Sequence, residues 1–106
     1  MEVSSTNKPF PEEPTYKQDF HRSVELFEKS FKELQHSEID QQKKMYVNVM
    51  KESLSIMHET ASAMVNQHLS KMKEKLDKDL TTYLDDPSTE HKNKVLKDIE
   101  GIKSAE

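Results

Sequence analysis

The sequence contains no cysteine and only one glycine, and these two shortages exclude several kinds of chemistry. Without cysteine the chain can form no disulfide, no thiolate metal site and no thiol nucleophile. Phosphate-binding loops and dinucleotide fingerprints need several glycines so that the backbone can approach the ligand closely. Because Gly101 is the only glycine, we expect neither a P-loop nor a Rossmann nucleotide site.

Long apolar runs and an excess of positive charge are also absent. No stretch reaches the roughly 18 apolar residues of a membrane span, and the first residues lack the charged-then-apolar pattern of a signal peptide. We therefore expect a cytoplasmic protein, with export by a route independent of a signal peptide as the alternative. The net charge is -4 and Arg22 is the only arginine. Nucleic-acid partners favour a basic, arginine-bearing face, so we expect none.

The content of large aliphatic residues and phenylalanine is low for a folded chain. Leu, Ile, Val and Phe together supply 22 of the 106 residues, which is close to the level of about 20% below which chains often stay unfolded. A length of 106 residues suits one domain. Because such a domain is marginally stable, a partner that binds only the folded form would add to its stability.

The first residues differ in composition from the rest. Residues 1–14 contain three of the four prolines, together with small polar residues, and this predicts a disordered N-terminal tail. Phe10 lies between two of these prolines and is a candidate for docking into the groove of a partner. We expect residues 15–106 to form a single helical domain.

The helical period predicts three helices in that domain. Thr15 and Gln18 match a capping box, and apolar residues then recur every three or four positions over residues 15–36. Ser37 offers a second cap, and residues 38–84 keep the helical period without proline or glycine, as a helix that is either continuous or broken near residues 53–62. Asp86 and Pro87 predict a stop and a new start, followed by a helix over residues 88–103. The expected fold is all-α: an elongated helical hairpin or three-helix bundle with one long central helix.

The central segment has more apolar surface than one neighbour can cover. Its main stripe contains methionines at positions 50, 57 and 64, and its spacing, slightly above 3.6 residues, argues against a long left-handed coiled coil. A second apolar row (Met45, Val49 and Ile56) projects roughly 100–140° away from that stripe. We therefore predict a partner interface, which comprises Leu26, Met45, Val49, Met50, Ile56 and Met57.

The polar residues do not form a convergent catalytic or metal-binding pattern. The E-x-x-H motif of di-iron bundles occurs once, at Glu33 and His36, where those bundles use it twice. We predict no enzymatic activity, no metal, no cofactor and no small-molecule substrate. His68 lies on the predicted apolar stripe, either as a partly buried, hydrogen-bonded histidine or as a pH-sensitive contact at an interface.

These observations favour a protein that acts by binding. The hypothesis is a small adaptor, chaperone-like or assembly protein whose methionine-containing face repacks against another copy or another helical protein. A secretion-associated role is one version, since the composition is similar to that of small helical hairpin proteins of specialised bacterial secretion systems. The alternatives are a purely structural homo-oligomer and, less in keeping with the evenly mixed charges, a protein that binds membrane surfaces.

Overall fold

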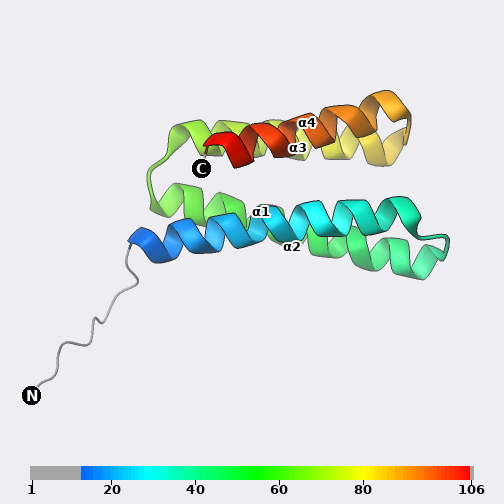
Figure 1. Cartoon of the computed structure of the whole chain (residues 1–106), viewed down its shortest axis with the longest axis horizontal. Helices are drawn as coiled ribbons and strands as arrows, with labels where there is room; N and C mark the ends of the chain where they lie inside the picture. Colours follow the sequence, from blue (N-terminus) through cyan, green and yellow to red (C-terminus); the bar gives the residue numbers. More distant parts are fainter. Residues whose placement is uncertain (1–12, 106) are drawn as a thin grey trace, which may run out of the picture.

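The computed structural model describes residues 13–105, and this part of the chain contains four α-helices and no strand (Figure 1). The helices are α1 (Glu13–His36), α2 (Asp40–Ala63), α3 (Gln67–Asp85) and α4 (Thr89–Ala105). Each helix runs antiparallel to the one before it, so that α1 pairs with α2 and α3 pairs with α4. The expected all-α, elongated class is confirmed, but with four helices instead of three.

The two hairpins are joined into one bundle by contacts between α2 and α3 and between α1 and α4. The buried apolar residues recur at helical spacing on every helix, as the sequence pattern requires. They form one cluster: Phe20, Val24, Phe27, Phe31, Met50, Leu54, Met57, Ala61, Leu69, Leu76, Leu80, Tyr83, Val95, Ile99 and Ile102. Because this cluster includes residues of all four helices, the bundle has a single core.

Phe31 is one of the residues through which the first hairpin contacts the second. Its ring stacks on Phe27 at a centroid distance of 6.5 Å and meets the ring of Tyr83 on α3 edge to face at 5.2 Å. The Tyr83 hydroxyl donates a hydrogen bond of 3.0 Å to the Gln35 side-chain oxygen. Aromatic pairs of this geometry add to the effect of area burial, so this contact helps to hold α3 against α1.

The prediction of one long helix over residues 38–84 is wrong, because the chain turns at residues 64–66. The Asn66 amide donates to the Ala61 carbonyl and the Val65 amide to the Ser62 carbonyl, both at 3.0 Å. This is the Schellman pattern that ends many helices. Asn66 then caps α3, since its side-chain oxygen accepts a hydrogen bond of 3.0 Å from the Leu69 amide. Two helices of moderate length therefore replace the predicted rod.

Val65 occupies the position of this turn that usually belongs to glycine. Its φ angle is 54°, which is the left-handed region that β-branched residues avoid. Its side chain is 79% exposed, so it contributes little packing in return. This strained residue explains why the sequence, with no glycine or proline nearby, did not reveal the turn.

Replacing Val65 with glycine is expected to stabilise the protein by about 0.5–1 kcal/mol, because the relief of strain exceeds the added entropy of the unfolded chain. The midpoint of urea unfolding measures the change. Val65→Ala is the matched control and should gain less stability than Val65→Gly, since alanine keeps the Cβ atom. A lower midpoint for Val65→Gly would show that the turn is not left-handed.

Three predicted helix starts also shift by a few residues. The first helix starts at Glu13, so Thr15 lies inside it and is not its cap. Helix α2 follows Ile39, which has no capping side chain, and Ser37 lies before it. The His91 amide donates to the Ser88 hydroxyl at 3.3 Å, so Ser88 caps α4 in place of Asp86. Helix ends commonly differ by one or two residues from their sequence signals.

Candidate interaction surface

A groove runs along the outer side of the α1–α2 hairpin, and two predicted interface residues line it. Leu26 on α1 and Ile56 on α2 are 43% and 39% exposed, and both face this groove of about 500 Å³. Asp19, Arg22 and Glu59 provide its charged side chains. We call it the seam groove. It brings together two apolar side chains that are far apart in sequence.

The seam groove continues as an apolar face along α2. At about 100° per residue, Met45 and Val49 lie within roughly 40° of the direction of Ile56. Met45 is 51% exposed and Val49 is half-buried. Large exposed apolar residues on one face are informative when they adjoin each other. Met45 and Ile56 of the second apolar row are therefore exposed, and Val49 is half-buried.

Met50 and Met57 lie elsewhere. Both are fully buried in the core cluster. Methionine fills irregular gaps between helices well. They are therefore not available to a partner in this structure, and the candidate surface is limited to Leu26, Met45, Val49 and Ile56.

The remaining two candidate residues are not part of this surface. His68 is exposed on the first turn of α3, whereas the sequence placed it on a continuous apolar stripe. The turn at residues 64–66 restarts the helical phase, and this moves His68 off the stripe. Phe10 lies outside the residues that the structure describes.

Small hydroxyl residues between α1 and α2 were not recognised from the sequence. Ser23 and Ser30 on α1 and Ser53 and Thr60 on α2 are buried. The Ser53 hydroxyl donates to the Val49 carbonyl at 2.8 Å and the Thr60 hydroxyl to the Ile56 carbonyl at 2.7 Å, so neither is left unpaired. Small side chains allow two helices to approach closely. In each helix the two small residues are seven positions apart, and this spacing was the sequence signal for the close contact.

A pair of carboxyl groups joins α3 to α4 on another side of the bundle. The Lys75 ammonium lies 3.0 Å from Asp79 Oδ2 and 3.0 Å from Asp98 Oδ1. The Asp98 side chain is only 8% exposed, and no N–H group or hydroxyl among the described residues donates to its Oδ2. Burial, and then the hydrogen bond with Asp79, raise the pKa of Asp98 to about 6, while the hydrogen bond with Asp98 lowers the pKa of Asp79. A proton on Asp98 that points to Asp79 accounts for both shifts.

The Asp98 carboxyl predicts a pH-dependent stability. Folding raises the pKa of Asp98 above the ordinary 3.8. The protonated carboxyl therefore stabilises the fold fully below pH 3.8, and this stabilisation is lost as the pH rises through about 6. Asp98→Asn keeps a neutral donor at every pH. We expect the free energy of unfolding of this variant, relative to that of wild type, to increase by about 1 kcal/mol as the pH rises from 5 to 7, after allowing for screening by solvent.

Thermal unfolding of both proteins at the two pH values measures this difference, which corresponds to roughly 4–8 °C in Tm for a domain of this size. Glu74→Gln, on an exposed position of α3, is the control and should show no such change. A difference between wild type and Asp98→Asn that is constant with pH would refute the shared proton.

Neither a membrane span nor a cluster of metal ligands occurs among the described residues. No helix between residues 13 and 105 is long and apolar enough to cross a membrane. Within the same range, no three side chains of His, Asp or Glu gather as metal ligands would. Compared with known protein families, curated proteins and solved structures, the chain matches none. Its function must therefore be inferred from the surface itself.

Proposed function

We propose that this protein is a helical protein–protein interaction module whose binding surface is the seam groove and the apolar row beside it. The observation that carries the proposal is the exposure of Leu26 and Ile56 in one groove, with Met45 and Val49 continuing the same face of α2. A chain with so few large apolar residues places four of them together outside its core. Covering such residues would add to the marginal stability of a small domain.

The chemistry of the groove indicates what kind of partner fits. Its apolar centre is bordered by Asp19, Arg22 and Glu59, which gives both signs of charge around an apolar strip. That arrangement suits the apolar side of an amphipathic helix, whose anchors recur at spacings of three and four residues. Both helices of the hairpin keep their backbone hydrogen bonds internally, so side chains must supply the specificity.

This surface serves either an adaptor or chaperone-like protein with a different partner, or a homo-oligomer. A secretion-associated protein is one form of the first. We favour the adaptor because exposed Met45 lies on the same face of α2 as Ile56, about three helical turns away, and a flexible methionine can repack against different partner side chains.

The variant Leu26→Lys/Ile56→Lys tests the proposal. Both positions are exposed, so the fold should survive while two charges enter the apolar strip; Thr81→Lys/Asn93→Lys adds the same charge at exposed positions of α3 and α4. Association is measured by sedimentation of the purified protein and by recovery of a stoichiometric partner on the immobilised protein. We expect association to be lost in the first variant only.

Each outcome of that comparison has a meaning. Self-association that disappears in the first variant would assign the surface to a homo-oligomer, and loss of a different partner would assign it to an adaptor. Equal association of wild type and both variants would contradict the proposal, as would a wild-type monomer that recovers no partner.

A further inference from the structure

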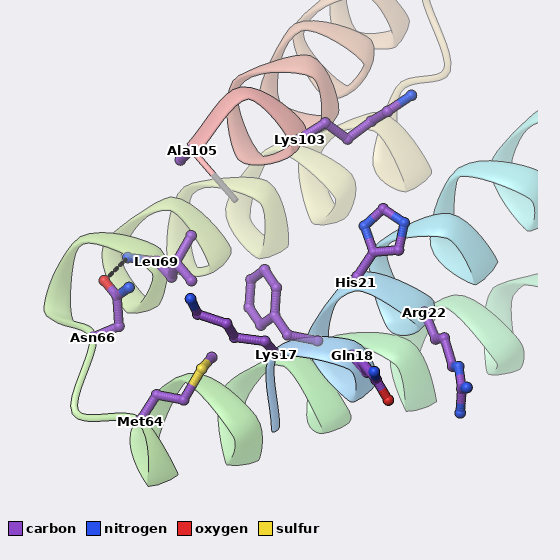
Figure 2. Close-up of a pocket in the computed structure, with 10 residues that line it drawn as sticks. Lys17, Gln18, His21, Arg22, Met64, Asn66, Leu69, Lys103 and Ala105 are labelled. Carbon is purple, nitrogen blue, oxygen red and sulfur yellow. Dashed lines mark hydrogen bonds between the residues drawn. The ribbon is translucent and has the colours of Figure 1, made fainter. Parts of the chain in front are cut away.

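A second groove lies at the end of the bundle where α1 begins and α4 ends (Figure 2). Its volume is about 580 Å³, which is within the usual range of about 300–1,000 Å³ for small-molecule sites. Residues of α1 and α4 line it together with Met64 and Leu69, which flank the turn between α2 and α3. We call it the end groove. It exists because the chain turns at residues 64–66.

The ionisable side chains that line the end groove are all basic: Lys17, His21, Arg22 and Lys103. Lys103 also lies 3.2 Å from Glu28, and His21 lies 3.2 Å from Glu25. Lys17 and Arg22 form no ion pair with any side chain described between residues 15 and 105. In a protein with a net charge of -4, this groove is a local concentration of basic side chains, which favours an anionic ligand.

Lys17 is the basic residue best placed to meet a ligand. Figure 2 shows its side chain extending across the groove toward Leu69, while Arg22 lies at the edge and points away. An ammonium group that can rotate on a flexible stem pairs well with a single carboxylate. We therefore place the ligand's anionic group beside Lys17.

The floor of the end groove is apolar. Phe20 of α1 and Leu69 of α3 lie beneath it, and half-buried Met64 forms part of the wall. The aliphatic stems of the long basic side chains add further apolar surface. Helices leave no open strand edge to which an extended peptide could bind, whereas an acyl chain needs no backbone partner. The end groove thus combines a basic rim with an apolar interior.

We propose that the end groove binds a single-chain anionic amphiphile, namely a carboxylate with an acyl chain of medium length. The carboxylate pairs with Lys17, and the chain lies over Phe20, Leu69 and Met64. This site shares only Arg22 with the seam groove, and the proposal does not depend on the proposed interaction function.

Fluorescence titration of the full chain with a dansyl-labelled undecanoate, kept below its micelle concentration, tests the site. We expect saturable binding of one probe per chain and displacement by dodecanoate. Octanoate should compete at least about tenfold more weakly, because it buries fewer methylene groups. Lys17→Glu should weaken probe binding by at least about tenfold. Lys78→Glu, the same charge change on exposed α3 surface, should leave it within about twofold.

Two competing ligands distinguish a site for an acyl carboxylate from a simple anion site and from non-specific adsorption. Displacement by inorganic phosphate as effective as that by dodecanoate would show a site for simple anions and overturn the proposal. Equal displacement by dodecyltrimethylammonium would show non-specific adsorption, with the same consequence. Because Lys17 does not line the seam groove, a failure here leaves the interaction surface untouched.

Discussion

Replacing Phe31 with alanine is expected to lower the free energy of unfolding by about 3–5 kcal/mol, the usual cost of deleting a buried aromatic ring. Phe31 is fully buried and contacts both Phe27 and Tyr83. The substitution therefore leaves a cavity and removes the aromatic contact between α1 and α3. Since small domains have about 5–15 kcal/mol of stability in total, the substitution should remove a large part of the stability and lower the midpoint of unfolding.

Urea unfolding followed by circular dichroism measures the loss, and Phe31→Leu provides the matched control. Leucine refills most of the volume but cannot form the edge-to-face contact, so we expect it to recover roughly half of the lost free energy. If Phe31→Ala costs less than about 1 kcal/mol, Phe31 is not at the centre of the core.

Replacing Met57 with alanine is expected to cost about 2–5 kcal/mol, whereas the same change at Met45 should cost less than about 0.5 kcal/mol. The two side chains have the same chemistry and lie on the same helix, but Met57 is fully buried and Met45 is 51% exposed. The difference between the two losses of stability therefore measures the effect of burial. It also separates a methionine that is buried in the core from one that is exposed.

The same urea experiment gives both values, and Met57→Leu, which conserves volume, should cost less than about 1.5 kcal/mol. Equal losses at the two positions would mean that Met45 is buried in solution, either within the monomer or by association. Repeating the Met45→Ala measurement at several protein concentrations separates these two cases, since only association depends on concentration.

Much of the fold follows from the periodicity of the sequence. The apolar residues of α1 recur at three and four positions, and Phe20, Val24, Phe27 and Phe31 all lie in the core. The end of α3 was also predictable, because Asp86 and Pro87 favour a stop. The turn at residues 64–66 was not, since a β-branched residue adopts a left-handed conformation there and Asn66 can occur inside helices as well as at their caps.

The candidate surface was predictable in part for the same reason. Helical phase alone places Met45, Val49 and Ile56 on a face away from the main stripe, and the structure leaves that face outside the core. Phase alone could not show that Leu26 lies beside Ile56, because this depends on how α1 packs against α2. The end groove could not be predicted from the sequence, because it is formed by the turn that the sequence did not reveal.

Photo-crosslinking from position 56 tests the central claim most directly. A benzoylphenylalanine placed at Ile56, in the seam groove, is compared with one placed at Lys78 on exposed α3 surface, each with the natural interaction partners present. We predict a single adduct of defined mass from position 56 that disappears when Leu26→Lys is added, and no such adduct from position 78. The adduct's mass distinguishes a second copy from a different partner. No adduct from position 56, or the same adducts from both positions, would contradict the account.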